Sequence, residues 1–455
     1  MTVSSTPCTR RAFLGAVAAT LVPLSSRAEQ VMPAADGFRV LEARRSPLQL
    51  LTAPSPETTC FGYEGLVPGP LLRVRQGEDV RVRLVNRLDQ PTTLHWQGLR
   101  GENAMDGVGG LTQKAVAPGA TFDYRFMAAD SGLYLYKPNA LPHTVEQISR
   151  GLSGVLIVDE ANPPESDKDL LVVMQDWKLD AHAQAATPFD DAGAGEGRIG
   201  DHLTANRAVA PLIETAPPGA RVRLRVVNAC VARIAIATFE GGAPSCVAID
   251  GQPCDPFHLV RNTAPMAPGA RFDFLLDAPE REGDELKLGL WQGQDKPLQP
   301  FLALKAQGAK VGARAPIVGL PMNTRLPPEI RLGDAKKAEL VIDPPKAPGK
   351  GWTINGAPHG YAGKPLFTVR RGTPVSFGFA NRSGVALAMH VHGFSMRLLH
   401  DLDDGWEPYW RNAVIVPKGA TKHVALLADA PGKWAVHCDI ADHEAAGLAA
   451  WFEVI

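Results

Sequence analysis

Short stretches of alternating apolar and polar residues recur along most of the chain, and glycines and prolines interrupt them. In one stretch Val80, Val82 and Leu84 occupy every second position, and the stretch 222–226 has the same alternation. A period of two places successive side chains on opposite faces of a β-strand. Patterns typical of helices are few. The chain is therefore predicted to consist of β-sandwiches.

The pattern of strands and turns occurs three times at matching spacing. Gly77 precedes Asn86 by nine residues, and glycine and asparagine are separated by the same nine residues at 219–228 and 372–381. A second block, a Gly-Ala step that opens another strand, begins near residues 119, 269 and 419. Self-similarity at fixed spacing indicates repeated structural units.

Three repeats predict an all-β fold of three consecutive domains. Their expected limits are residues 37–160, 161–312 and 313–455. The repeats also place candidate metal-ligating histidines at equivalent positions. Gly77 precedes His95 by eighteen residues, and Gly372 precedes His390 by eighteen. The middle repeat has Ala237 at that offset. We therefore expect the middle domain to be a spacer and the outer two to share a site.

Composition and charge narrow the class of function. The chain has 455 residues, of which 45% are apolar and 21% are charged, and its formal net charge is -1. This is the composition of an ordinary soluble protein. Without a long basic stretch, binding to nucleic acid or to an anionic membrane has no electrostatic support. No later stretch is long and apolar enough to predict a transmembrane helix.

The N-terminal region has the features of an export signal. Residues 9–14 read TRRAFL, a twin-arginine motif, and the apolar stretch 13–22 that follows is too short to span a bilayer. A Ser-Arg-Ala segment ending at Ala28 offers small residues for cleavage. We expect 1–28 to be a twin-arginine signal peptide and the protein to be periplasmic or secreted. The alternative is an N-terminus that merely contains arginines.

Five cysteines follow the signal region, at positions 60, 230, 246, 254 and 438. An exported protein is free to form disulfides, but sequence alone does not establish their pairing. Cys438 is the candidate for a thiol outside any disulfide, because it lies among histidines.

The richest group of candidate ligands lies near the C-terminus. His437 precedes Cys438, and His443 follows five residues later. Imidazole and thiolate together are the ligands of blue-copper sites. An isolated cysteine beside two histidines would more readily be structural. Here a second histidine pair lies at 390–392 and a further histidine, His95, lies far away in the chain, so a metal site is predicted.

On these motifs and repeats, the chain resembles the multicopper oxidases, the laccase-like family of three cupredoxin domains. The resemblance covers nearly all of the chain after the signal region, including NAMDGV at 103–108 and GLSG at 151–154. It implies three cupredoxin-like Greek-key β-sandwiches, copper cofactors and oxidoreductase activity. In signal type, size and altered ligands the chain is also similar to a twin-arginine-exported cell-division member of this family.

The resemblance assigns a role to each ligand position, and several positions are substituted. The retained positions are His95 and His390 for type 2 copper, His392 and His437 for one type 3 copper, and Cys438, His443 and the axial Leu448 for type 1 copper. The substituted positions are Gln97, Lys137 and Asp439 at the other type 3 copper, Asn139 at the first, and Leu387 at type 1.

Two of these substitutions introduce opposite charges at one former copper position. We expect Lys137 and Asp439 to form a buried ion pair with Gln97 hydrogen-bonded to it, because a buried lysine without a partner is costly. The alternative is that Lys137 extends to solvent.

Four-copper reduction of dioxygen is not expected, because the trinuclear cluster and the type 1 site are both incomplete. One hypothesis is a copper-binding oxidoreductase with a remodelled site, in which His95 and His390, with His392 and His437, hold a single copper or zinc ion. An unknown small molecule or metal ion would then be the reductant. Asp106 matches a family acid near the cluster and is the candidate for proton transfer.

The second hypothesis is a pseudo-oxidase that binds no metal. Its histidines would be inherited and hydrogen-bonded to one another, and the scaffold would bind a periplasmic protein partner in a role at the cell envelope. The sequence names neither a substrate nor that partner.

Overall fold

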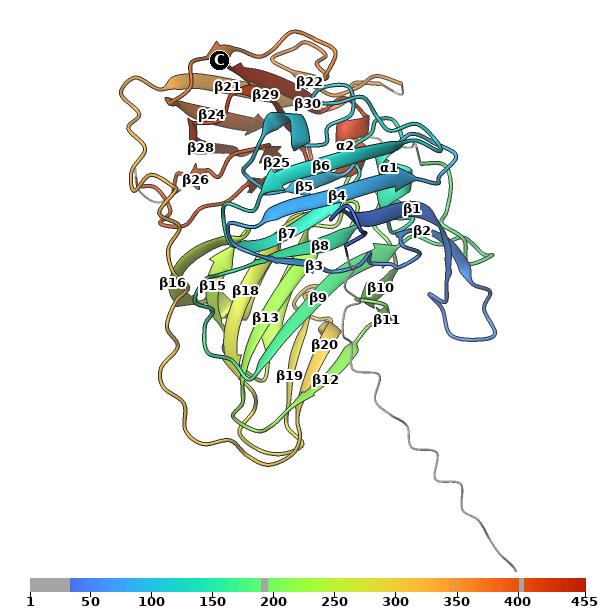
Figure 1. Cartoon of the computed structure of the whole chain (residues 1–455), viewed down its shortest axis with the longest axis vertical. Helices are drawn as coiled ribbons and strands as arrows, with labels where there is room; N and C mark the ends of the chain where they lie inside the picture. The colour runs from blue at the N-terminus through green and yellow to red at the C-terminus, as the bar shows by residue number, and fades with distance from the viewer. Residues whose placement is uncertain (1–32, 190–194, 348, 401–404) are drawn as a thin grey trace, which may run out of the picture.

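In the residues that the structure describes, the protein is an all-β assembly whose strands are interrupted only by short helices (Figure 1). The computed structural model describes residues 33–189, 195–347, 349–400 and 405–455. The signal peptide predicted at 1–28 lies outside the described residues. The prediction of an all-β fold is confirmed. In the described part of the chain, no helix has the length and apolar character needed to cross a membrane.

The first sandwich consists of two four-stranded sheets. One sheet, in the order β2-β1-β4-β6, contains β1 (Arg39–Leu48), β2 (Thr58–Tyr63), β4 (Asp79–Asn86) and β6 (Thr121–Met127). The other, in the order β3-β8-β7-β5, contains β3 (Leu72–Arg75), β5 (His95–Gln97), β7 (Gly132–Lys137) and β8 (Gly154–Asp159). The short helices are η1 (Asn103–Met105) and α1 (Thr144–Ser149). Val82 and Leu84 of the first sheet share a core with Trp96 and Tyr136 of the second.

The second sandwich follows directly. Its larger sheet, in the order β11-β10-β9-β13-β18-β15-β16, contains β9 (Lys168–Trp177), β10 (His202–Ala205), β11 (Ala208–Val209), β13 (Arg221–Asn228), β15 (Ser245–Ile249), β16 (Gln252–His258) and β18 (Arg271–Asp277). Its smaller sheet, in the order β12-β20-β19-β14-β17, contains β12 (Leu212–Ala216), β14 (Ala235–Glu240), β17 (Thr263–Met266), β19 (Glu285–Leu290) and β20 (Gln299–Ala306), and η2 is Val260–Asn262.

The third sandwich carries the C-terminal ligand motif. One sheet, in the order β22-β21-β24-β28-β26, contains β21 (Lys336–Asp343), β22 (Thr353–Ile354), β24 (Thr373–Asn381), β26 (Arg397–Leu398) and β28 (Thr421–Ala428). The other, in the order β23-β30-β29-β25-β27, contains β23 (Thr368–Val369), β25 (Leu387–Val391), β27 (Ala413–Val416), β29 (Gly432–Cys438) and β30 (Ala449–Val454), and α2 is Ala441–Ala445. The domain limits expected from the sequence stay predictions.

The repeated glycine-to-asparagine spacing corresponds to one strand in each sandwich. Strands β4, β13 and β24 each pair in parallel with the first strand of their sandwich and antiparallel with the strand of the second repeated block. Each ends at the repeated asparagine. Its side-chain amide donates to a backbone carbonyl that follows in the chain: Asn86 to Val116 at 2.8 Å, Asn228 to Met266 at 2.9 Å and Asn381 to Val416 at 3.1 Å. The asparagine therefore ties the strand end to a later loop.

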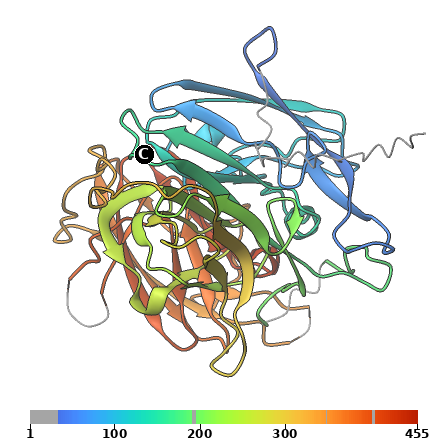
Figure 2. The same cartoon turned by 90° about the horizontal axis from the view of Figure 1, so that it is seen from below.

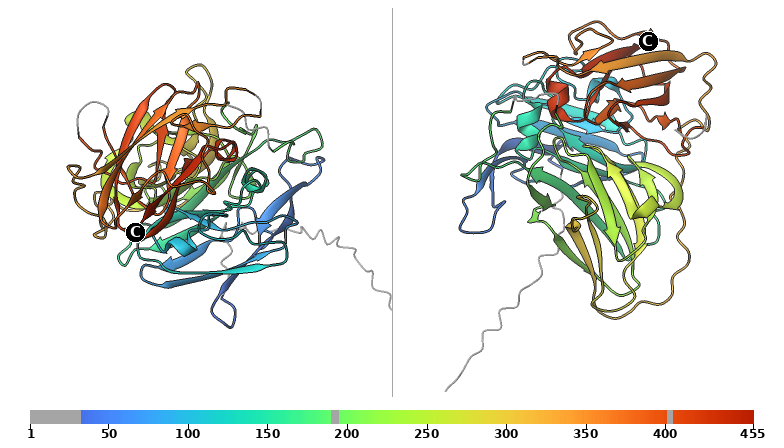
Figure 3. Two further views of the ribbon diagram at one scale, coloured as in Figure 1. Left: turned by 90° about the horizontal axis from the view of Figure 1, so that it is seen from above. Right: turned by 180° about the vertical axis from the view of Figure 1, so that it is seen from behind.

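The three sandwiches pack against one another. Buried residues of β7 and β8 in the first sandwich form a joint core with Val173 and Val227 in the second. Seen from below, the blue-to-teal first sandwich lies beside the green-to-red remainder of the chain (Figure 2). The short helices α1 and α2 lie side by side where the first and third sandwiches meet (Figure 3). This boundary positions the candidate site.

Candidate metal centre between the first and third sandwiches

Strand register places the predicted ligand positions opposite one another. In the first sandwich β5 pairs with β7 so that His95 faces Lys137. In the third sandwich β25 pairs with β29 so that His390 faces His437. The equivalence of the first and third repeats, expected from their spacing, therefore extends to cross-strand pairing.

Three imidazoles converge in the interior. His95, His390 and His392 are each at most 1% exposed, and one ligand nitrogen from each lies within 4.8 Å of the others. His95 Nδ1 lies 2.7 Å from the Asp106 carbonyl oxygen, and His390 Nδ1 lies 2.5 Å from that of Asn412. Since a carbonyl only accepts, both Nδ1 atoms donate, and each Nε2 carries a lone pair.

Those two lone pairs have no protein partner. Among the described residues, His95 Nε2 and His390 Nε2 are buried without any hydrogen bond. Buried polar atoms are nearly always satisfied, so two such atoms close together call for an explanation. A metal ion accepts neutral imidazole lone pairs, and a carbonyl on the opposite ring nitrogen is the usual way of orienting such ligands.

His392 is tied at both nitrogens. Its Nδ1 lies 2.9 Å from Asp106 Oδ2, and its Nε2 lies 2.7 Å from His437 Nε2. The Asp106 carboxylate also approaches His95 Nδ1 at 3.4 Å. Asp106, the predicted acid, thus contacts two of the three converging imidazoles. Its role in proton transfer stays a prediction.

Burial favours the neutral imidazoles that a metal requires. It lowers the pKa of His392 to about 3, against the opposing effect of Asp106, and it lowers the pKa of His390 well below its ordinary value. Burial also acts to raise the pKa of Asp106, but the neighbouring His392 and His95 outweigh it and bring that pKa well below its usual range. These directions favour neutral rings at His390 and His392 and an ionised carboxylate at Asp106.

An ion pair occupies the position that the resemblance assigns to one type 3 copper. Lys137 Nζ donates to Asp439 Oδ1 at 3.1 Å, and Gln97 Nε2 donates to Asp439 Oδ2 at 2.8 Å. The side chain of Asp439 is fully buried and that of Lys137 is 9% exposed. The predicted pairing is confirmed, and the alternative of Lys137 in solvent is wrong.

The side chains of this ion pair offer a metal ion no free ligand atoms. Burial would raise the pKa of Asp439, but Lys137, followed by His390, outweighs burial and lowers it. The carboxylate is therefore ionised and committed to Lys137 and Gln97. An ammonium group offers no lone pair to a metal, so copper does not fit here.

The second candidate site, around Cys438, is incomplete. Cys438 Sγ lies 3.5 Å from His443 Nδ1 and accepts the Ala388 amide at 3.4 Å. Leu387 and Leu448 are fully buried in the same hydrophobic core. Blue-copper sites use two histidines and one cysteine, whereas this site has one histidine.

Burial favours the neutral thiol and the neutral imidazole of this pair. It raises the pKa of the Cys438 thiol to about 12 and lowers the pKa of His443 to about 4. His443 Nε2 lies 2.7 Å from the Gly195 carbonyl, which fixes the ring. All five cysteines in the described part of the chain are free and buried.

Several residues around the centre were not predicted from the sequence. Asn412 orients His390 through its carbonyl. Glu444 Oε2 lies 3.7 Å from His437 Nδ1, and the Tyr361 hydroxyl donates to Glu444 Oε1 at 2.5 Å. Glu444 directly follows the predicted ligand His443, and this position could have indicated that Glu444 lies near the site. Tyr361 and Asn412 lie in loops without a motif.

The fold and the histidine and cysteine motifs at this boundary are those of the multicopper oxidase family. Family profiles described as "Multicopper oxidase" match residues 47–163 and 334–455. A crystal structure of a multi-copper oxidase from Pseudomonas thermotolerans is 32% identical, with a TM-score of 0.81, over 91% of this chain and 98% of that one. The chain belongs to the multicopper oxidase family, whose members are copper oxidoreductases.

Other relatives support the same assignment. A multi-copper oxidase structure from Pseudomonas parafulva is 28% identical, with a TM-score of 0.80, over 92% of this chain and 100% of that one. Multicopper oxidase MmcO of Mycobacterium tuberculosis is 27% identical over 514 residues, which cover 98% of this chain and 96% of the relative. Membership implies copper cofactors. In the part of the chain that the structure describes, His95, His390 and His392 form a group that fits a metal ion.

Proposed function

We propose that this protein is a copper-binding oxidoreductase with a remodelled centre that holds one metal ion at His95, His390 and His392. The observation that carries the proposal is the pair of buried, unpartnered Nε2 atoms of His95 and His390. Both rings are held by backbone carbonyls in the tautomer that a metal requires. Three imidazole nitrogens suit Cu(II) or Zn(II).

Four-copper reduction of dioxygen is not part of this proposal. Lys137 and Gln97 both donate to Asp439 at the position that the resemblance assigns to one type 3 copper. His392 Nε2 lies 2.7 Å from His437 Nε2, and a metal ion held by His392 would replace this contact. Leu387 supplies no donor at the type 1 position. When bound, the single metal would supply Lewis acidity or one-electron chemistry, while Asp106 keeps His392 and His95 oriented.

A metal titration tests the proposed site. The apo protein is titrated with Cu(II) and separately with Zn(II), and binding is compared with that of His95→Ala/His390→Ala and of His202→Ala. The matched control His202 is an exposed histidine at the start of β10 in the second sandwich. The double variant should lose tight binding and the control should retain it. Equal binding in all three proteins would reject the site.

A non-catalytic scaffold that binds a periplasmic protein partner is the second candidate function, with a role at the cell envelope. The coherent replacement of a whole ligand set by Lys137, Asp439 and Gln97 supports it, because random substitution would rarely place a buried lysine against a buried aspartate. Under this alternative the apo protein binds no copper tightly and retains full stability without it. The titration above separates the two.

We also propose export by the twin-arginine route, based on the TRRAFL motif at 9–14. Arg10→Lys/Arg11→Lys should then leave the protein in the cytoplasm of a host with this pathway. Equal amounts of the parent and the variant in the periplasmic fraction would reject the proposal.

A further inference from the structure

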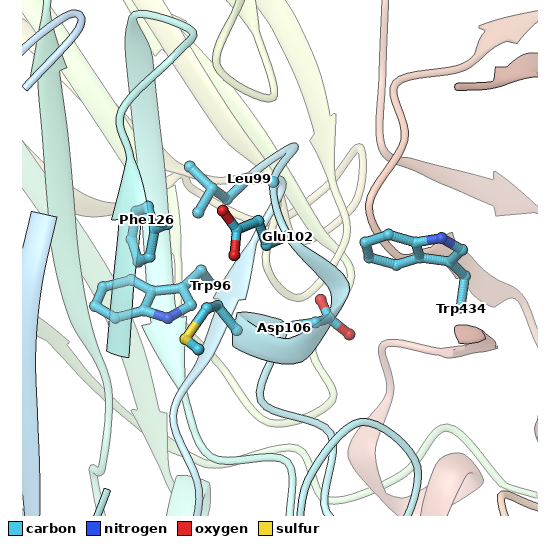
Figure 4. A pocket seen from close by; sticks show the side chains of 8 residues that line it. Trp96, Leu99, Glu102, Asp106, Phe126 and Trp434 are labelled. Carbon is cyan, nitrogen blue, oxygen red and sulfur yellow. The ribbon is translucent and has the colours of Figure 1, made fainter. Parts of the chain in front are cut away.

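The backbone carbonyls that orient His95 and His390 are held in different ways. The carbonyl beside His95 belongs to Asp106, which directly follows η1 in the same sandwich. Figure 4 shows the Asp106 side chain in the wall of a pocket, with Glu102 close by and Trp434 of the third sandwich opposite. The first sandwich therefore supplies both His95 and its carbonyl. The carbonyl beside His390 is held from another sandwich.

Asn412 supplies the carbonyl that accepts from His390 Nδ1 at 2.5 Å. It lies just outside the strand ladder, because the pairing of β25 with β27 ends at His390 and Ala413. Among the described residues, both polar atoms of the Asn412 side chain are buried without a hydrogen bond, so that side chain does not anchor the residue. The backbone N–H of Asn412 does, by donating to Asp250 Oδ2 of the second sandwich at 3.1 Å.

Asp250 and Gly251 form the turn between β15 and β16. Both have a positive φ, 51° for Asp250 and 81° for Gly251, and Asp-Gly is a favoured sequence for two-residue hairpin turns of this kind. Asp250 is 5% exposed, and its Oδ1 accepts the backbone N–H of Arg271 at 3.2 Å. The carboxylate therefore receives two backbone N–H groups, one from its own sandwich and one from the third.

Arg271 ties this turn to the first sandwich. The residue is fully buried. Its Nη2 donates to the Asp250 carbonyl at 3.0 Å, and its Nε donates to the Leu133 carbonyl of β7 at 2.8 Å. A Cβ atom on Gly98 of the first sandwich would come within 2.2 Å of Arg271 Nη2 and 2.4 Å of Asn412 Nδ2. All three sandwiches therefore meet beside the candidate centre, and the turn is fixed where they meet.

We propose that Asp250 is a positioning residue for the metal ligand His390 and acts through the backbone of Asn412. By anchoring Asn412 it keeps a carbonyl on His390 Nδ1, so that the lone pair stays on Nε2, the atom left for a metal. The second sandwich, expected from the sequence to be a spacer, is then part of the centre. This inference rests on the proposed metal site and extends it from the ligands to the side chain that holds one of them in place.

The test uses two variants of Asp250 and one matched control. Asp250→Gly removes the carboxylate but keeps the turn, because glycine adopts a positive φ without strain. Asp250→Asn also suits the turn and keeps one of the two acceptor oxygens. The control Asp255→Gly makes the same change at an exposed position of β16, five residues later in the same hairpin. Glycine weakens a strand, so this control loosens the hairpin while the contact with Asn412 remains.

Three quantities are measured for each protein. They are the affinity for Cu(II), the electron paramagnetic resonance spectrum at saturating copper, and the solvent exchange of the His390 ring N–H. The exchange is followed by NMR in metal-free protein that carries isotope-labelled histidine. Asp250→Gly should weaken copper binding about 10–100-fold, change the copper hyperfine splitting and speed the exchange. Asp250→Asn should lie between Asp250→Gly and the parent, and Asp255→Gly should match the parent.

The outcomes separate the positioning role from the metal centre. An Asp250→Gly variant that matches the parent in affinity, spectrum and exchange would overturn the positioning role and leave the metal centre intact. Equal changes in Asp255→Gly would also overturn that role, because any loosening of the hairpin would then suffice. If the parent binds no copper, the metal centre is rejected. Faster exchange of the His390 N–H in Asp250→Gly would then still support the positioning role, and unchanged exchange would overturn it.

Discussion

The buried pair Lys137–Asp439 is expected to contribute strongly to the stability of the folded chain. Asp439→Ala removes the acceptor of both Lys137 and Gln97. It leaves an ammonium group whose side chain is 9% exposed, so the charge has little access to water. Breaking a buried pair from one side costs about 3–5 kcal/mol. A domain of about 150–250 residues loses about 2–4 °C of melting temperature per kcal/mol, so the transition of the sandwich that contains Asp439 should shift by roughly 6–20 °C.

The matched experiments separate a buried pair from an exposed one. Lys137→Met/Asp439→Leu removes both charges and should recover most of the loss, because apolar replacement of a buried pair is often near neutral. Glu280→Ala breaks the pair with Lys310, whose side chains are 60% and 69% exposed, and should cost about 1 kcal/mol or less. Unfolding is followed by urea titration and by calorimetry.

Two results would refute this reasoning. One is an Asp439→Ala variant as stable as the parent, which would mean that Lys137 finds water or another acceptor at little cost. The other is a double variant as unstable as the single one, which would mean that the loss reflects packing and not an uncompensated charge.

Three further predictions concern the metal sites. Gln97→His/Lys137→His/Asp439→His replaces the ion pair with three imidazoles and should raise the copper content measured by elemental analysis; unchanged content would mean that these side chains do not converge as ligands. Leu387→His adds a second imidazole beside the buried thiol and should produce the visible absorption of a blue-copper site, which the parent should lack. Asp106→Asn weakens the contact that orients the metal ligands and should reduce copper affinity about 10–100-fold; unchanged affinity in a copper titration would remove Asp106 from the site.

The sandwich architecture could be predicted from the sequence because the alternation and spacing that define a strand lie within a short stretch of the chain. The spacing from Gly77 to Asn86 sets the length of one strand, and its repetition sets the same strand in three sandwiches. The sequence also predicted the pairing of Lys137 with Asp439. Two buried side chains of opposite charge at one ligand position are stable only when they pair with each other or with another polar group.

What the sequence lacked were contacts that depend on loops folding over the site. Asn412 orients His390 from a loop, and its role is carried by a backbone carbonyl that any residue possesses. Glu102 lines a pocket whose opposite wall, Trp434, is more than three hundred residues away in the chain. Such arrangements follow from the packing of two sandwiches, which residue spacing does not encode.

The most direct test of the central claim is the number of copper ions per chain. Protein folded in the presence of copper, freed of loosely bound metal, is analysed for copper and zinc and examined by electron paramagnetic resonance. About one metal ion per chain, with copper in a nitrogen-ligated, non-blue environment and lost in His95→Ala/His390→Ala, is the predicted result. Three or four coppers per chain, with a blue type 1 signal, would show that the substituted positions still bind copper and would contradict the account.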